Sequence, residues 1–193
     1  MGNLYIGLLH YPMQNRRGDV VTTSMTSMDV HDIARTGKTY GALQYYVVTP
    51  MKTQREIARR LRGYWTEDER QRENSNRGEA LELVSVLDKL EEGILDIEDR
   101  EGARPLLVGT SARDLPAKSM SYAEGREAID QGERPVFVLF GTGWGMADEL
   151  IEKTDYLLPP IVGVGEFNHL SVRAAVAITL DRLQGDLYSS AEQ

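Results

Sequence analysis

The sequence predicts an α/β domain with a mostly parallel sheet and flanking helices. Short apolar runs of strand length alternate with longer segments whose apolar residues recur every three or four positions. Two of the runs, residues 105–109 (PLLVG) and 135–140 (PVFVLF), are apolar throughout, as in strands buried on both faces of a parallel sheet. A chain of 193 residues has the length of one domain, so residues 1–193 are expected to form a single unit.

The first part of the chain is expected to hold two strands, each followed by a helix. Residues 3–9 (NLYIGLL) and 43–48 (LQYYVV) are predicted strands, and a proline follows each within a few positions. Apolar and small residues three and four apart predict a helix over residues 29–40. Thr53 and Glu56 have the spacing of a capping box, which predicts that the second helix begins there.

The middle of the chain contains the least regular segment. Residues 66–78 (TEDERQRENSNRG) have many charges and no aliphatic residue, so they are expected to be a loop or an excursion from the core. The spacing of the apolar residues in the segment after residue 78 fits both a strand and a helix. We interpret it as a strand over 81–86 and a helix over 88–100.

The last part of the chain continues the alternation of strands and helices. Ser121 and Glu124 form a second capping box, which predicts a helix that ends at Gly132. A short helix is expected after Gly145. The final helix is predicted from apolar residues that share one face between positions 172 and 183.

Composition narrows the classes of function. No apolar run approaches the roughly 20 residues that a membrane span needs, and no basic leader precedes the first apolar stretch, so a cytoplasmic protein is expected. Without cysteine there is no disulfide framework and no cysteine-ligated metal. The three histidines, His10, His31 and His169, are far apart, so no metal site is expected.

The charge distribution leaves room for one local phosphate-binding face. The net charge of −8 argues against broad coating of nucleic acid. Residues 1–77, however, hold 12 Lys and Arg against 8 Asp and Glu, while residues 78–193 hold 10 against 22. The N-terminal part is therefore basic, although an ordinary solvated surface would have the same composition.

Three loops of small residues follow predicted strands: 109–113 (GTSAR), 141–145 (GTGWG) and 161–165 (IVGVG). The carboxyl ends of parallel strands meet at one edge of a sheet, where such folds bind ligands. Glycine lets main-chain groups approach a flat heterocycle, although a single loop of this kind is most often only a tight turn. The spacing G-x-G-x-G differs from the dinucleotide fingerprint, and no Gly-Lys-Ser/Thr loop is present.

Three segments together resemble the SPOUT superfamily of RNA methyltransferases, and in particular a small bacterial branch with no appended RNA-binding domain. They are residues 29–41 (DVHDIARTGKTYG), 140–145 (FGTGWG) and 168–175 (NHLSVRAA), in the order typical of the family. The last segment, which follows a strand ending in proline, is the most specific. The resemblance implies a C-terminal deep trefoil knot, a homodimer, and S-adenosyl-L-methionine (SAM) held bent in the knot.

The resemblance also implies which residues bind SAM, largely through backbone groups. By position they are Thr110, Ser111, Phe140, Gly141, Thr142, Gly143, Trp144, Gly145, Pro160, Ile161, Gly163, Asn168, His169, Leu170, Ser171 and Ala175.

Arg35 matches the motif arginine of the family, which orients phosphate or assists deprotonation of the acceptor near the partner subunit's cofactor. The alternative is a surface arginine paired with Asp32, three residues away. Asp29 and His169 stand where the ribose-methylating branch has asparagine, with Asn168 adjacent to the second position. Asp29 or His169 could serve as the base, so a base nitrogen is at least as suitable an acceptor as a ribose.

An arginine stripe on the second helix, opposite its apolar positions 57, 58 and 61, is a candidate for contact with RNA phosphates. A solvated helix face is the alternative. With two loop arginines added, the RNA-binding candidates are Arg16, Arg17, Arg55, Arg59 and Arg62.

The function predicted from these features is SAM-dependent methylation of tRNA or rRNA by a cytoplasmic homodimer, with no membrane and no metal involved. Two alternatives stay open. One is a non-catalytic protein that binds SAM or RNA with the same knotted fold. The other is a plain nucleotide-binding α/β protein, which would prefer phosphorylated ligands.

Overall fold

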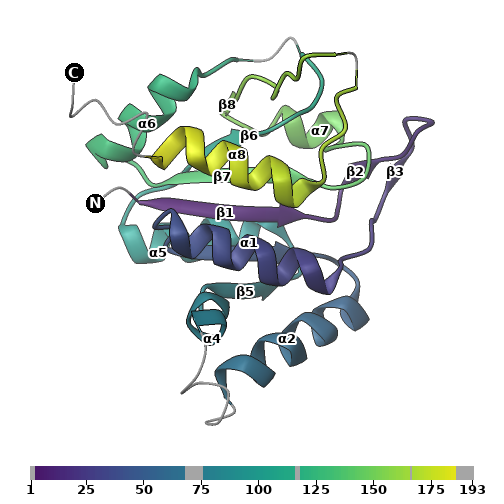
Figure 1. Ribbon diagram of the computed structural model, residues 1–193, viewed down its shortest axis with the longest axis vertical. Helices are drawn as coiled ribbons and strands as arrows, with labels where there is room; N and C mark the ends of the chain where they lie inside the picture. Colours follow the sequence, from purple (N-terminus) through teal and green to yellow (C-terminus); the bar gives the residue numbers. More distant parts are fainter. Residues whose placement is uncertain (1–2, 68–75, 116–117, 166, 186–193) are drawn as a thin grey trace.

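The computed structural model describes residues 3–67, 76–115, 118–165 and 167–185. Its centre is a six-stranded sheet in the order β5-β4-β1-β7-β6-β8, and every neighbouring pair is parallel (Figure 1). The strands are β1 (Leu4–Leu9), β4 (Gln44–Val48), β5 (Val84–Leu87), β6 (Leu106–Gly109), β7 (Val136–Gly141) and β8 (Tyr156–Leu157). The predicted α/β class with a mostly parallel sheet is therefore confirmed.

Helices cover both faces of the sheet (Figure 1). They are α1 (Ser27–Thr39), α2 (Lys52–Thr66), α4 (Asn76–Leu81), α5 (Leu90–Glu101), α6 (Tyr122–Gln131), α7 (Asp148–Ile151) and α8 (Val172–Gln184). A short antiparallel hairpin of β2 (Met13–Gln14) and β3 (Val20–Val21), which the sequence did not predict, projects beside the sheet.

The alternation of side chains along β1 explains the two hydrophobic layers. Leu4, Ile6 and Leu8 point into the core that α1, α6 and α8 cover. Tyr5 and Leu9 point into the opposite core, against α5 and α7. Each fully buried side chain of this kind contributes roughly 1.5–3 kcal/mol, so the central strand is a main source of stability.

Two helix starts follow the capping rules. Thr26 caps α1 and Ser121 caps α6, in each case with a reciprocal bond from the third residue of the helix, Asp29 or Glu124. The predicted end of α6 is also confirmed, since Gly132 adopts the left-handed conformation there.

The predicted start of α2 is wrong. The helix begins at Lys52, Met51 occupies the N-cap position without a side-chain bond, and Thr53 lies inside the first turn. The Gln54 side chain accepts a hydrogen bond from the backbone N–H of Met25. A contact with a distant segment thus replaces the local capping box at this end of the helix.

The region expected to be a loop and then a strand over 81–86 is different in the structure. Residues 76–81 form α4, and the strand begins only at Val84. Ala80 and Leu81 are buried in the core beside α1, so packing stabilises a turn of helix where the alternating pattern suggested a strand. Most of the predicted excursion, residues 68–75, lies outside the described residues.

Neither a membrane span nor a metal cluster is found in the described part of the chain. No helix there is long and apolar enough to cross a membrane. The same residues contain no group of three or more His, Cys, Asp or Glu side chains that could hold a metal ion.

Candidate functional site

A cavity of about 340 Å3 opens at the carboxyl ends of β6 and β7. Its walls are the loops after these strands, the segment that leads from β8 to α8, and one face of α8. Ligands of parallel α/β folds bind at this edge of the sheet, and the volume lies within the range of small-molecule pockets. The cavity is therefore the candidate ligand site.

Most of the residues assigned to SAM from the sequence line this one cavity. The lining includes Thr110, Ser111, Phe140, Gly141, Thr142, Gly143, Trp144, Gly145, Ile161, Asn168, His169, Leu170 and Ala175. Pro160, Gly163 and Ser171 do not line it. Ser171 instead caps α8 by accepting a hydrogen bond from the N–H of Ala174 at 3.3 Å.

The cavity also contains residues that the sequence interpretation left out. They are Ala112, Arg113, Tyr122, Pro159, Val172 and Thr179. Val172 and Thr179 are three and four residues from Ala175, so helical spacing could have identified them. Tyr122 starts α6, and only the tertiary packing brings it to the cavity.

The hydroxyl groups in the cavity walls bond to the ends of the strands. Thr110 donates to the carbonyl of Leu139 at 2.9 Å. Thr142 donates to the carbonyl of Leu9 at 3.0 Å. Gly143 and Gly145 have left-handed φ angles of 62° and 100°, which a residue with a side chain adopts only at a cost. The two glycines therefore present main chain to the cavity, with Trp144 between them.

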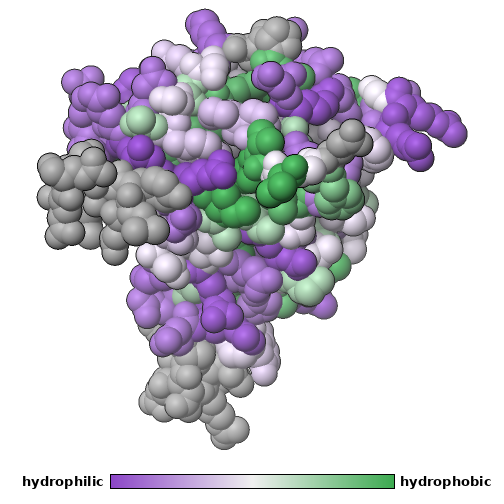
Figure 2. Space-filling model, turned by 45° about the horizontal axis from the view of Figure 1, so that its top comes forward, coloured by the Kyte–Doolittle hydropathy of each residue, from purple (hydrophilic) through white to green (hydrophobic). Residues whose placement is uncertain are grey.

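The segment between β8 and α8 is tied to the rest of the cavity through Asn168 and His169. The amide of Asn168 donates to the carbonyl of Ala112 at 2.8 Å, which joins this segment to the loop after β6. The His169 ring lies between the rings of Trp144 and Phe167. Figure 2 shows a group of hydrophobic side chains on the face of the molecule that is turned forward in that view.

The charges in the cavity do not suit a phosphate cradle. Among the described residues that line the cavity, Arg113 is the only Lys or Arg and none is Asp or Glu. Glycine backbone and apolar side chains form most of this lining. Such a lining fits a nucleoside without phosphates, such as the adenosine part of SAM.

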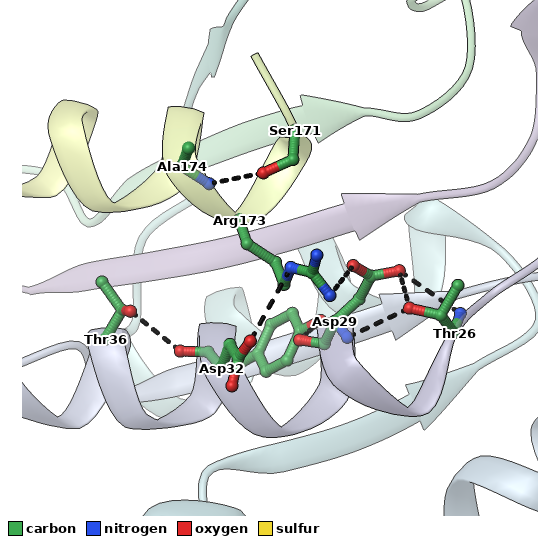
Figure 3. A network of polar contacts seen from close by, with 8 residues as sticks. Thr26, Asp29, Asp32, Thr36, Ser171, Arg173 and Ala174 are labelled. Atoms are coloured by element: carbon green, nitrogen blue, oxygen red, sulfur yellow. Dashed lines mark hydrogen bonds and ion pairs between the residues drawn. The ribbon is translucent and has the colours of Figure 1, made fainter.

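Asp29 and Arg35 lie on α1, outside the cavity lining. The Asp29 carboxylate is largely buried, accepts a hydrogen bond of 2.6 Å from the Thr26 hydroxyl, and lies 3.9 Å from the Arg173 guanidinium (Figure 3). Asp32 pairs with the same arginine at 3.7 Å. Asp32 therefore pairs with Arg173 rather than with Arg35, whereas the exposure of Arg35 agrees with the alternative of a surface arginine.

Two arginines of the predicted RNA stripe bond to the protein, although only Arg55 is partly buried and Arg59 is exposed. Arg55 forms an ion pair of 2.8 Å with Asp88 and donates to the carbonyl of Thr49. Arg59 donates to the carbonyl of Val86. Their guanidinium groups thus join α2 to the ends of β4 and β5, and this use competes with contact to RNA.

The apolar face predicted for α2 is confirmed in part. Ala58 is buried and Leu61 packs against the core, whereas Ile57 is half exposed. The Nε atom of Arg62 is buried without a partner among the described residues. Arg16 and Arg17 lie exposed in the turn between β2 and β3, so these two and Arg59 are the exposed members of the five RNA candidates.

His10 is fully buried beside the cavity. Its Nδ1 atom lies 3.1 Å from the Thr23 hydroxyl and 3.4 Å from that of Thr142. Its Nε2 atom has no hydrogen-bond partner among the described residues. Burial lowers the pKa of the imidazole from 6.5 to about 4, with a smaller opposing effect of Asp29, so the ring is neutral near pH 7.

The fold and the site define a parallel α/β protein with a glycine-lined nucleoside pocket at the carboxyl edge of its sheet. Residues 3–185 match the model of a family of SAM-dependent RNA methyltransferases. The match covers more than half of the chain. The chain therefore belongs to this family of enzymes, and the membership suggested by the SPOUT motifs is confirmed.

Two relatives and one solved structure show how widely the similarity extends. The chain is 45% identical over 181 residues to an uncharacterized protein of Aquifex aeolicus, covering 94% of this chain and 88% of that protein. It is 42% identical over 184 residues to a tRNA (guanine-N(1)-)-methyltransferase of Oleidesulfovibrio alaskensis, covering 95% of this chain. Only 42% of that methyltransferase is covered, so the chain spans less than half of its length.

The solved structure is that of the SpoU methyltransferase AviRb from Streptomyces viridochromogenes in complex with SAM. The TM-score is 0.57 at 16% identity, and the alignment covers 98% of this chain and 60% of that one. At this identity the comparison shows a shared fold. It agrees with the SPOUT-like arrangement of sheet and helices described above.

Proposed function

We propose that this protein transfers the methyl group of SAM to an RNA. The observation that carries the proposal is one cavity that unites two of the three motif segments, the glycine loop after β7 and the Asn168–Leu170 segment, with the loop after β6. We propose tRNA or rRNA as the substrate and a base nitrogen or a ribose hydroxyl as the acceptor. The family membership and the name of the Oleidesulfovibrio relative support this choice.

SAM, when bound, supplies a methyl group already activated by its sulfonium. The chain's own residues then need only to bind, to align the acceptor and to accept its proton. The Gly141–Gly145 loop and Leu170 would hold the nucleoside through backbone groups, and Arg113 is the lining cation suited to a carboxylate. His169 lines the cavity, so it is better placed than Asp29 to take the proton.

Asp29 and Asn168 have structural roles in this proposal. Asp29 completes the capping box of α1 and binds Arg173. Asn168 holds the segment before α8 against the loop after β6. Both residues thereby position the walls of the cavity, and neither needs to touch the acceptor.

We further propose a cytoplasmic homodimer formed by a single domain with the C-terminal knot. Arg35 is exposed and does not line the cavity of its own chain, which supports a role at the partner's cavity. Backbone bonds join residues 118–120 to Leu157, and Asn168 reaches Ala112, so the C-terminal segment passes close to the loop after β6. This passage supports the knot. The cytoplasmic location follows from the proposed RNA substrate.

The first experiment measures cofactor binding by calorimetric titration with SAM and S-adenosylhomocysteine, with ATP and NAD as controls. We expect micromolar binding of the first two only. A preference for ATP or NAD would favour the plain nucleotide-binding alternative.

The second experiment measures methyl transfer from labelled SAM to RNA isolated from cells that lack this gene. We expect incorporation of label, and mass spectrometry of the nucleosides then identifies the acceptor atom. Ala175→Phe, which places a ring in the cavity, should abolish transfer, whereas Ala123→Phe on the exposed surface of α6 should not. SAM binding without incorporation into any RNA would favour the non-catalytic alternative.

A further inference from the structure

Three aromatic rings meet at the mouth of the cavity. His169 lies between Trp144 and Phe167, with ring centroids 6.3 Å and 5.4 Å apart and interplanar angles of 64° and 82°. Trp144 comes from the loop after β7, and Phe167 from the segment before α8. Two segments far apart in the sequence therefore build one aromatic cluster, which we call the aromatic triad: Trp144, Phe167 and His169.

The triad is exposed to an unusual degree for large apolar side chains. Trp144 is 55% exposed and Phe167 is 79% exposed. Val162, Val164 and Leu170 in the same segment are also exposed, which extends the apolar surface around the mouth. Contiguous exposed apolar surface beside a cavity is typical of a binding site.

The position of the triad indicates what it binds. Trp144 and His169 line the cavity, whereas Phe167 does not, so the triad continues the cavity wall outward. An RNA acceptor must approach the methyl group through this opening. Proteins recognise unpaired RNA bases by stacking them on aromatic rings, and enzymes that modify a nucleotide take its base out of the stack.

We propose that the aromatic triad is a stacking site for an unpaired base of the acceptor RNA, at or next to the methylated nucleotide. The proposal rests on the proposed function and adds the substrate class, an unstacked nucleotide. In this proposal Phe167 contacts the unpaired base of the RNA and does not contact SAM. Because every base has a π-face, the site binds single-stranded RNA with little sequence preference.

A second copy of the chain is the rival occupant of the same apolar surface. A protein that covered the whole triad would block the approach of the acceptor, whereas the proposed dimer needs only the partner's Arg35 to reach the cavity. The His169 ring between the two other rings also offers a polar edge, which suits a base better than an apolar protein core. The observations therefore favour RNA over a protein partner.

The test uses tryptophan fluorescence as a direct report on the triad. The chain has two tryptophans, so Trp65→Phe leaves Trp144 as the only tryptophan, which is excited selectively over the tyrosines. This variant is titrated with a single-stranded mixed-sequence oligoribonucleotide and with the same length of abasic backbone, both in the presence of S-adenosylhomocysteine. We expect the base-containing strand to quench Trp144 and to bind about tenfold more tightly than the abasic strand.

Matched variants separate the triad from the rest of the surface. Phe167→Ala should weaken binding of the base-containing strand by about tenfold, whereas Phe167→Tyr should retain it. Tyr64→Ala, which removes an aromatic ring that is 55% exposed on α2, should leave binding unchanged. Calorimetry with SAM should give the same affinity for all three variants, because neither Phe167 nor Tyr64 lines the cavity.

Two results would overturn the proposal. One is equal binding of the base-containing and abasic strands. The other is a Phe167→Ala protein that binds RNA as before but sediments as a monomer when the wild type sediments as a dimer, which would make the triad a subunit interface. The wild-type protein could also bind the base-containing strand more tightly than the abasic strand and yet transfer no methyl group to any RNA. That result would contradict the proposed function and leave the stacking site supported.

Discussion

Gly143 and Gly132 adopt nearly the same left-handed backbone in different surroundings, with φ angles of 62° and 64°. Gly143 lines the cavity, and Gly132 ends α6 with no atom near the position of a Cβ. Gly→Ala at either position should lower the free energy of unfolding by about 1 kcal/mol through backbone strain. Only Gly143→Ala should also weaken SAM binding, because its Cβ would lie 3.0 Å from the Thr23 side chain and displace the loop.

Denaturant titrations and calorimetry on the two variants check this expectation. Gly132→Ala is the control for strain without a change in the cavity. If both variants bound SAM with wild-type affinity, the loop after β7 would not be part of the cofactor site.

Buried His10 should make the fold sensitive to acid. Its pKa in the folded protein is about 4, below the usual 6.5, so the unfolded chain binds more protons between these values. The lowered pKa of His10 therefore does not affect the free energy of unfolding above pH 6.5. As the pH falls from 6.5 toward 4, the unfolded chain takes up a proton that the folded protein does not, and the free energy of unfolding decreases. At 1.36 kcal/mol per pKa unit, the loss amounts to about 3 kcal/mol.

His10→Asn removes the titrating group and keeps an acceptor for Thr23. Urea denaturation at pH 7.5 and pH 4.5 should show a smaller acid-induced loss of stability for this variant than for the wild type. The carboxylates titrate in both proteins, so the difference between them isolates His10. Equal losses in the two proteins would contradict the lowered pKa.

At the scale of elements, α8 is attached to α1 through Arg173, which lies between Asp29 and Asp32 (Figure 3). Arg173 is 28% exposed, so water screens this contact only in part. Arg173→Met leaves the largely buried Asp29 carboxylate without its cation and should lower the free energy of unfolding by about 1–2 kcal/mol. The difference from wild type should shrink in 1 M salt.

Lys153→Met is the matched control, because Lys153 forms an ion pair of 3.8 Å with Glu91 in which both side chains are more than 60% exposed. Its effect on stability should stay below about 0.5 kcal/mol. Equal effects of the two substitutions would mean that the contact between α1 and α8 does not depend on Arg173.

The elements that the sequence predicted well have local signals. The capping box of α6 and its terminal Gly132 lie within one short stretch, and the apolar runs of β6 and β7 are continuous. The start of α2, the helix α4 and the hairpin of β2 and β3 were missed. Each depends on a distant partner, such as the bond from Met25 to Gln54 or the burial of Leu81.

At the scale of the whole molecule, the proposed dimer would place Arg35 of one subunit at the cavity of the other. Arg35→Ala and Ala175→Phe should each be inactive when assayed alone. In a mixture of the two, a heterodimer has one cavity that combines an intact pocket with the partner's intact Arg35. Random exchange of subunits should restore about a quarter of the wild-type rate of methyl transfer.

Methyl transfer is measured after the two variants are unfolded together and refolded, with the separately refolded proteins as controls. Activity of Arg35→Ala alone would contradict a role of this residue at any cavity. Two inactive variants that stay inactive when mixed would place Arg35 and the pocket in the same subunit.

The sequence by itself determined the α/β class, most of the strand and helix positions, and the loops that line the cavity. These features depend on local periodicity, on capping residues and on glycine, all of which neighbouring positions specify. Only the tertiary structure decided that Tyr122 joins the cavity, that Arg55 and Arg59 donate to backbone carbonyls near the ends of β4 and β5, and that Asp32 pairs with Arg173. Such contacts depend on strand order and helix packing, which bring together residues that no local pattern relates.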